Sequence, residues 1–338
     1  MTAMQPRERV PFDLFGMREP VRVSTLVRVG ERGWTCGLCP LDTSGGVVSP
    51  GSVLDQAGFV ARMIVTVLGR GGFQRDDLAM LVIYHSASQR EETALRDTFE
   101  AAFPAGPVLS LIRVPHFYYD GMMLEVDVFA DASLRPAHPE RARFTDRHGS
   151  AYRYVGLQGV TDADLKAQED AAGISIDGIV WEHRVGAWEP VTAVTPEAVL
   201  RPALDGSNPC SAALILAAHG SVVAKRAEEG SVILTARRTG DTAVLTALSV
   251  AEDTGIVPQT RAIMAVLDQE LREQGLGWAH VVKVSAPYVG GAREADLHDN
   301  LRIRHSFHVA PGPASTGLPA FGLGHSAARI AVQLTAIA

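Results

Sequence analysis

The sequence predicts an α+β protein in which one unit, a β-sheet with two helices packed on one face, occurs twice. A strand–helix–strand–helix–strand–strand pattern extends over 34–130, and a weaker copy of it occupies 230–338. The offset between the copies is nearly constant, because Gln259 follows Gln56 by 203 positions and Phe307 follows Phe103 by 204. A repeat of domain size predicts two similar domains rather than one large sheet.

The first copy is defined by two amphipathic helices between apolar strands. Apolar residues recur at helical spacing over 52–71, where Gly71 and Gly72 end the helix. A second helix is predicted at 90–103. Apolar runs predict strands at 21–29, 34–41, 79–85, 107–114 and 123–129. Two helices with one apolar face each predict a sheet covered on one side.

The second copy repeats these elements in the same order, with helices at 257–275 and 294–307 and strands at 281–288 and 330–338. We therefore expect one domain at 1–131 and another at 230–338. Between them, 132–229 is expected to be a connecting or inserted region of mixed structure. It contains a hairpin-like piece at 148–159, a polar helix candidate at 161–172 and strand-rich segments at 181–194 and 212–218.

Composition and charge exclude several classes of function. The 338 residues are 46% hydrophobic and 20% charged, with a net charge of −7. This mild acidity predicts neither a nucleic-acid partner nor a membrane partner, and no apolar run reaches the ~18 residues of a membrane span. The polar N-terminus, which has no secretory signal, predicts a cytoplasmic protein. No nucleotide-binding fingerprint or metal-binding histidine spacing occurs, so we expect neither a cofactor nor a metal.

Cys36 and Cys39 form a lone C-x-x-C pair. A redox centre or half of a zinc site are the functional interpretations. The pair lies in a strand-like run, where positions three apart point to opposite faces, and no second pair occurs. We favour small structural residues, with the metal and redox interpretations kept open.

Four motifs, in the same order in both copies, resemble the Rid family of reactive-intermediate deaminases, also called YjgF-like or L-PSP endoribonuclease-like. The run W-T-C-G-L-C-P-L-D at 34–42 is similar to the family's Y-T-S-G-Q-I-P-L-D. Gln259-Thr260-Arg261 resembles its E-A-Q-T-R helix, 313–317 resembles its P-A-R-S segment, and 124–127 resembles I-E-I-E. The resemblance implies two chorismate mutase-like domains, and a homotrimer with ligand pockets between subunits.

The family's active members hydrolyse enamines and imines, with an arginine that clamps the substrate carboxylate and a glutamate that moves a proton. The resemblance places the glutamate at Glu125 in the first copy and at Gln333 in the second. It places Leu109 and Ala314 at the arginine positions. Poor hydrolysis of small 2-imino acids is therefore expected.

The same resemblance and the neighbouring residues define the candidate site. Glu125 is the expected catalytic residue. An aromatic loop at 116–120 could stack on an unsaturated ligand. The expected substrate-binding residues are Cys36, Arg96, Arg113, Tyr118, Tyr119 and Asn300.

Three functions remain open at this point. The first is a Rid-superfamily enzyme that hydrolyses an imine, an enamine or an enol ether of a small metabolite. The second is a non-catalytic ligand-binding or scaffold protein. The third is a chorismatase-like hydrolase, since chorismatases are also doubled forms of this fold and release pyruvate from chorismate. Ribonuclease activity is suggested only by the older family name, and the acidic charge argues against it.

Overall fold

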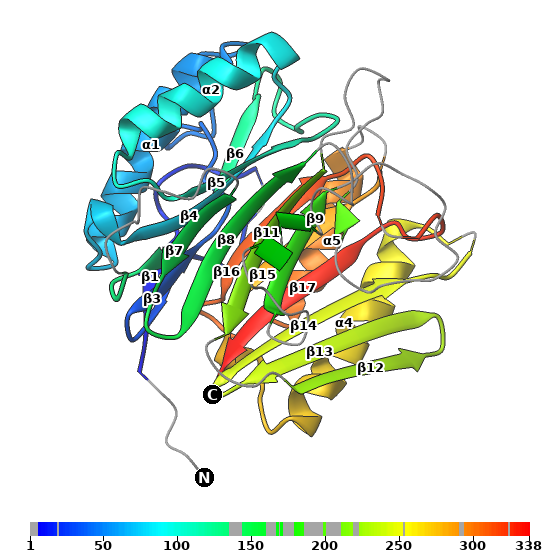
Figure 1. The fold of residues 1–338 in the computed structure, drawn as a ribbon. Helices are drawn as coiled ribbons and strands as arrows, with labels where there is room; N and C mark the ends of the chain where they lie inside the picture. Colours follow the sequence, from blue (N-terminus) through cyan, green and yellow to red (C-terminus); the bar gives the residue numbers. More distant parts are fainter. Residues whose placement is uncertain are drawn as a thin grey trace.

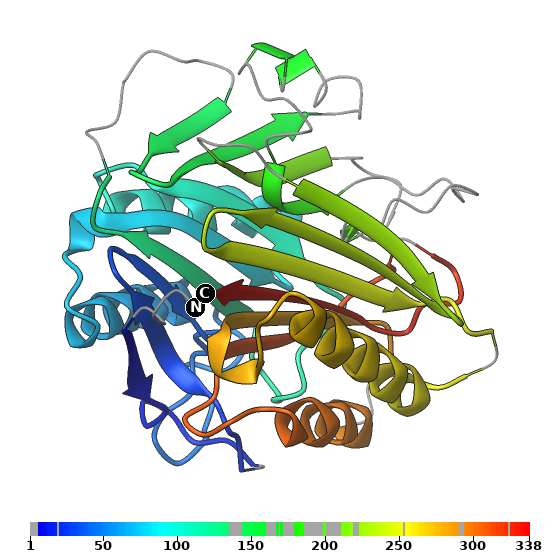
Figure 2. The ribbon, with the colours of Figure 1, turned by 90° about the horizontal axis from the view of Figure 1, so that it is seen from below.

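The computed structural model describes residues 6–18, 20–134, 144–159, 167–168, 170–171, 179–185, 199–200, 211–218, 223–252, 254–290, 294–323 and 325–338. The strands of these residues form two six-stranded sheets and one five-stranded sheet. In chain order, the first and last sheets have six strands and the middle sheet has five. Figures 1 and 2 show helices on the outer sides of the first and last sheets, with the middle sheet lying across them. The predicted α+β class, with two helix-covered sheets, is confirmed.

The first sheet has the strand order β1-β2-β3-β6-β4-β5. Its strands are β1 (Arg7–Pro11), β2 (Ser24–Val29), β3 (Arg32–Thr35), β4 (Leu78–His85), β5 (Val108–Arg113) and β6 (Leu124–Asp131). Helices α1 (Val53–Arg70) and α2 (Gln89–Ala102) connect them, with a short 3-10 turn at Arg75–Asp77. The parallel pair β4–β5 results from the crossover through α2.

Alternation along β6 decides which side chains face the helices. Leu124, Val126 and Val128 belong to the apolar core under α1 and α2. The intervening Glu125 and Asp127 therefore lie on the helix-free face of the sheet. The strand thus turns two carboxylates toward the centre of the molecule.

The last sheet repeats this topology in the order β12-β13-β14-β17-β15-β16. Its strands are β12 (Val223–Glu229), β13 (Val232–Thr239), β14 (Thr242–Ser249), β15 (Val281–Tyr288), β16 (Ala314–Pro319) and β17 (Ala331–Ile337). Helices α4 (Ile256–Glu273) and α5 (Glu294–Ser306) cover one face, with a 3-10 turn at Trp278–His280. A separate apolar core lies between this sheet and its helices.

The middle sheet lies within the region expected to be a mixed insertion. Its strands are β7 (Phe144–His148), β8 (Tyr152–Gly159), β9 (Ile179–Val185), β10 (Val199–Leu200) and β11 (Ser211–Ala218). Their order, β7-β8-β11-β9-β10, matches the last five strands in the order of each six-stranded sheet. The strand directions also match, because β9 and β10 are parallel and the other pairs are antiparallel.

The three sheets contact one another in a closed ring. The β15–β16 side of the last sheet packs on β2 and β3, and β5 of the first sheet packs on β7 and β8. Strand β9 of the middle sheet packs on β13 and β14, which closes the ring. A third apolar core, with Trp34, Tyr154 and Leu318 among its members, fills the centre.

Two sequence predictions need correction or fall outside the described chain. The strand expected at 34–41 ends at Thr35, and beyond it the chain forms isolated bridges from Leu38 to Val126 and from Leu41 to Val47. The helix candidate at 161–172 lies mostly outside the described residues, as does 186–194. None of the described helices has the length and apolarity that a membrane-spanning helix requires.

Candidate functional site

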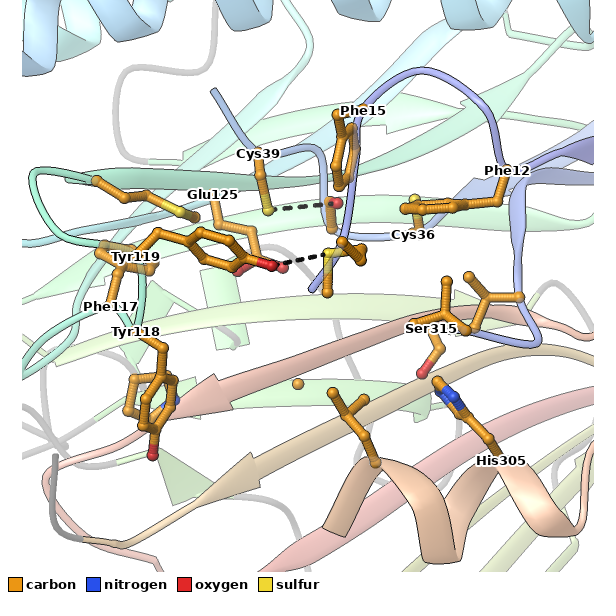
Figure 3. A pocket seen from close by; sticks show the side chains of 18 residues that line it. Phe12, Phe15, Cys36, Cys39, Phe117, Tyr118, Tyr119, Glu125, His305 and Ser315 are labelled. Atoms are coloured by element: carbon orange, nitrogen blue, oxygen red, sulfur yellow. Dashed lines mark hydrogen bonds between the residues drawn. The ribbon is translucent and has the colours of Figure 1, made fainter. Parts of the chain in front are cut away.

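A pocket lies between the first sheet and the α5–β16 part of the last unit (Figure 3). Its volume, including the open mouth, is about 670 Å³. Most of its wall is aromatic or aliphatic, and the aromatic residues are Phe12, Phe15, Phe117, Tyr118 and Tyr119. Residues from both the N-terminal and the C-terminal parts of the chain, from Phe12 to Pro319, therefore line one cavity. Its size and apolar lining are typical of small-molecule sites.

Glu125 reaches this pocket from β6. Its carboxylate occupies the space beside Gly37, where a Cβ atom would lie 1.7 Å from Oε1. The side chain is buried, and burial is the main cause that raises the pKa of Glu125 to about 8. The charge of Asp127 also raises this pKa, whereas Lys283 lowers it. At neutral pH the carboxyl group therefore holds a proton that it can donate.

A buried ion pair lies next to Glu125 and joins the two sheets. Lys283 on β15 donates hydrogen bonds to Asp127 Oδ1 at 2.7 Å, to the Thr35 carbonyl at 2.8 Å and to Thr316 Oγ1 at 2.7 Å. The side chains of Lys283 and Asp127 are 3% and 2% exposed. This pair holds the helix-free faces together at the pocket.

Cys36 and Cys39 both line the pocket, so the prediction that they point to opposite faces is wrong. That prediction assumed a continuous strand, whereas β3 ends at Thr35. Burial raises the pKa of both thiols, which keeps them protonated. The Cys39 thiol donates to the Gly37 carbonyl at 3.8 Å (Figure 3). Within the described residues, no group of three His, Cys, Asp or Glu side chains is arranged to hold a metal.

Tyr118 and Tyr119, from the aromatic loop at 116–120, line one side of the pocket. Tyr118 stacks on Tyr288 of β15, with ring centroids 6.0 Å apart. The Tyr119 hydroxyl accepts a hydrogen bond from the Arg18 backbone at 3.3 Å and contacts the Met17 sulfur at 3.5 Å. The N-terminal loop thereby closes over the aromatic wall.

Arg96 and Arg113, which the sequence proposed as binding residues, are not among the residues that line this pocket. Arg96 lies 4.0 Å from Glu100 on α2, and Arg113 lies 3.8 Å from Glu92. Both side chains are more than a quarter exposed. The structure thus separates these two arginines from Glu125.

Asn300, another of the proposed binding residues, does not line the pocket but binds the side chain of Arg304. Its Oδ1 accepts a 2.7 Å hydrogen bond from Arg304 Nε, one helical turn later on α5. Arg304 Nη1 donates to Ser315 Oγ at 3.2 Å, and Ser315 lines the pocket. Arg304 is fully buried, and burial lowers its pKa to about 10. The i, i+4 spacing of Asn300 and Arg304 was visible in the sequence, but the contact with β16 was not.

Comparisons with known proteins support the fold. No protein-family model and no curated protein sequence matches the chain. A solved chorismatase has a TM-score of 0.50 at 10% identity, and the match covers 77% of this chain and 93% of that one.

Smaller solved structures match about one third of the chain. Rv2704 from Mycobacterium tuberculosis, a member of the YjgF/YER057c/UK114 family, is 22% identical with a TM-score of 0.32, and the match covers 37% of this chain and 99% of that one. TdcF from E. coli, solved with bound serine, is 18% identical with a TM-score of 0.31 over 35% of this chain and 93% of its own. The chain therefore shares its overall fold with this chorismatase, and its two six-stranded sheets have the same strand order.

Proposed function

We propose that this protein is a hydrolase of the Rid superfold that acts on a small unsaturated metabolite, an enol ether, an enamine or an imine. The observation that carries the proposal is the buried, protonated Glu125 in an aromatic pocket between two sheets. A carboxyl group with a pKa of about 8 suits proton transfer near neutral pH.

Glu125 acts as the general acid in this reaction. It donates its proton to the terminal carbon of an enol ether double bond, or to the corresponding atom of an enamine or imine. Water then adds to the neighbouring carbon, and collapse of the adduct releases an alcohol or ammonia and leaves a carbonyl product. The proton lost by the added water restores the carboxyl group.

The other pocket residues support water as the nucleophile. Both thiols are buried and protonated, and a protonated thiol is a poor nucleophile. The wall formed by Phe117, Tyr118 and Tyr119 can stack on a conjugated π-system. We therefore favour general acid catalysis over a covalent intermediate.

Turnover of defined compounds tests the proposal. Chorismate, with pyruvate release as the readout, tests the chorismatase-like alternative. The enamine 2-aminoacrylate, which tautomerises to an imine, tests the enamine and imine classes with ammonia release as the readout. We expect Glu125→Gln to lower turnover of the accepted compound about 100-fold. The matched control, Glu100→Gln, changes an exposed carboxylate of α2 and should have no effect.

Binding without turnover identifies the second function. If a pocket ligand binds the wild-type protein and Glu125→Gln equally, and no product forms from chorismate or 2-aminoacrylate, the chain is a non-catalytic binder. Full activity of Glu125→Gln would overturn the role of Glu125.

The assembly and the location of the chain are also proposals. The family resemblance predicts a trimer of chains, in which neighbouring subunits complete each pocket. Here one chain supplies both walls of the pocket and closes the ring of three sheets. We therefore propose that one chain is the working unit, composed of domains at about 1–131, 132–229 and 230–338. A cytoplasmic location remains the prediction of the sequence.

A further inference from the structure

We propose that Arg304 binds a carboxylate of the ligand from the α5–β16 side of the pocket. The substrate class is then a small unsaturated carboxylate. This inference rests on the proposed use of the pocket, although its test measures binding rather than turnover.

The first observation is a buried cation without an anion. Arg304 is 0% exposed, and it forms no ion pair with any described residue. Its Nη2 atom has no hydrogen-bond partner in the described part of the chain, and neither does Nδ2 of Asn300. Burial of an uncompensated charge is costly, so a guanidinium kept in this state indicates a missing anionic partner.

The second observation is the position of the Nη2 atom next to a residue that lines the pocket. Nη2 lies 2.8 Å from the position that a Cβ atom of residue 317 would occupy, and the glycine leaves that space open. Gly317 and Ser315 line the pocket from β16. The guanidinium therefore lies directly behind the pocket wall. Of the two β16 residues named here, Gly317 is the one next to Nη2 and the one without a side chain.

The third observation is preorganisation. Asn300 fixes Nε, and Ser315 accepts from Nη1, so the guanidinium plane is held by two elements. The free hydrogens of Nη2 and of the Asn300 amide are then available to the two oxygens of a carboxylate. Such preset donors give bidentate recognition with little ordering cost.

The titratable groups near Arg304 and those that line the pocket leave the positive charge of Arg304 uncompensated. His305 and His308 are uncharged, since burial lowers their pKa values to about 2 and about 3. Glu125, Cys36 and Cys39 hold their protons at neutral pH. A ligand carboxylate thus meets one cation and no competing anion among these groups.

The position of Arg304 also bears on the missing arginine of the family motif. The residues that align with the family's arginine are Leu109 and Ala314, and both are buried and apolar. Arg304 supplies a guanidinium from helix α5 instead, next to the strand that contains Ala314. The carboxylate anchor is therefore moved from strand to helix in this chain.

Calorimetric titration with benzoate and its neutral isostere benzamide tests the inference. Both probes have a ring that fits an aromatic wall, and only benzoate has the charge. We expect benzoate to bind the wild-type protein at least tenfold more tightly than benzamide. Arg304→Met should weaken benzoate binding about 30-fold or more and leave benzamide binding unchanged.

Two further variants separate the binding role from a structural one. Gly317→Ala places a methyl group in front of Nη2 and should weaken benzoate binding while Arg304 remains. Arg302→Met removes an arginine of the same helix whose side chain is 59% exposed, and should change nothing. Circular dichroism confirms that each variant is folded.

Equal binding of the two probes to the wild-type protein would overturn the inference, as would an unchanged benzoate preference in folded Arg304→Met or Gly317→Ala. The outcome is independent of the hydrolase proposal. If the protein prefers benzoate but turns over none of the test compounds, the carboxylate site at Arg304 is supported and the hydrolase proposal is contradicted. If it turns over a test compound but does not prefer benzoate, the hydrolase proposal is supported and the carboxylate site is contradicted.

Discussion

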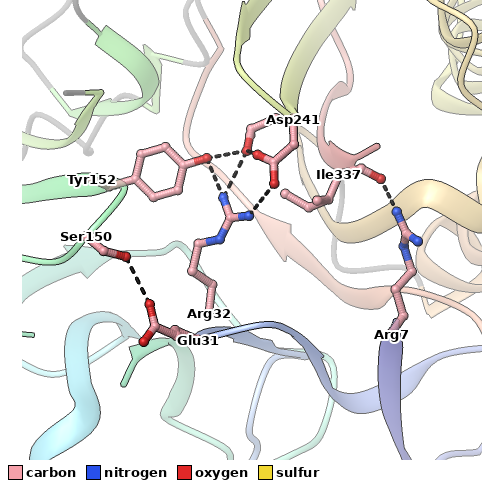
Figure 4. Close-up of polar contacts among 8 residues, drawn as sticks. Arg7, Glu31, Arg32, Ser150, Tyr152, Asp241 and Ile337 are labelled. Carbon is pink, nitrogen blue, oxygen red and sulfur yellow. Dashed lines mark hydrogen bonds and ion pairs between the residues drawn. The ribbon is translucent and has the colours of Figure 1, made fainter. Parts of the chain in front are cut away.

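Arg32 at the start of β3 and Asp241 before β14 form a 2.9 Å ion pair that joins the first and last sheets (Figure 4). Arg32 also donates to the Tyr152 hydroxyl at 2.7 Å and to Thr242 Oγ1 at 3.0 Å. Arg32, Tyr152 and Thr242 are the first residues of β3, β8 and β14. Corresponding positions of the three sheets therefore meet at one point, as subunits of a trimer meet at a threefold axis.

This closed junction predicts that the protein is a monomer. The edges that would join separate chains are already used within one chain, because each sheet packs on the next. Light scattering after gel filtration should give a mass near 36.1 kDa at micromolar concentrations. A mass three times larger would contradict the prediction and support the trimer implied by the family resemblance.

Glu125 should make the stability of the protein fall as the pH rises. Burial raises its pKa from 4.5 to about 8, so between these values the folded state keeps a proton that the unfolded state has lost. The stabilisation is complete below about pH 4.5 and is lost progressively up to about pH 8. Its size is on the order of a few kcal/mol.

Urea unfolding of the wild-type protein and of Glu125→Gln at pH 5 and pH 8 checks this. The amide does not ionise, so the variant lacks this contribution, whereas all other titrations are common to both proteins. The wild-type protein should lose more stability than the variant between the two pH values. Parallel pH dependences would mean that Glu125 ionises at its ordinary pKa.

Gly37→Ala should remove activity by displacing the catalytic carboxylate. The added Cβ would lie 1.7 Å from Oε1 of Glu125, so one of the two must move. We expect a loss of about 1–3 kcal/mol in stability and a fall in turnover similar to that of Glu125→Gln. Gly58→Ala on α1, where the nearest atom is 3.7 Å away, is the control and should be neutral or stabilising. Unchanged turnover in Gly37→Ala would show that the carboxylate position is not required.

Lys283→Met should destabilise the protein by about 3–5 kcal/mol, because it leaves Asp127 charged, buried and without its cation. The double variant Lys283→Met/Asp127→Asn removes both charges and should recover much of that loss. Urea unfolding of both single variants and the double variant gives the coupling energy. Additive effects would show that the two side chains do not stabilise each other across the sheets.

Much of the fold could be predicted because the relevant signals are local. The helical spacing of Val53, Ala57, Val60 and Ile64 gave α1 within one or two residues, and all four are buried. The apolar run of β15 matched at both ends. Glu125 was chosen because it matches the position of the family's glutamate, and the structure places it in the pocket, while its catalytic role stays a prediction. Such patterns depend on residues that are close in the sequence, so the spacing of apolar residues reveals them directly.

At 34–41 the sequence was misleading, because its composition predicts a longer strand than the one that pairs in the sheet. The run from Trp34 to Leu41 has strand composition, yet the continuous strand ends at Thr35 and only isolated bridges follow in this run. There the chain leaves the ladder and passes Glu125, and the absence of a side chain at Gly37 makes room for the carboxylate. Both cysteines consequently reach the pocket, which a continuous strand would have prevented.

By itself, then, the sequence determined the repeated unit, its helices and strands, and one catalytic candidate. The tertiary structure decided which distant residues share the pocket. Glu125 and Ser315 come from different copies and line the same pocket, and Lys283 meets Asp127 across 156 positions. The tertiary structure also decided that the strands of the middle sheet close the ring of three sheets. These contacts depend on how whole sheets pack, and side-chain packing between elements far apart in the chain leaves no periodic trace in either one.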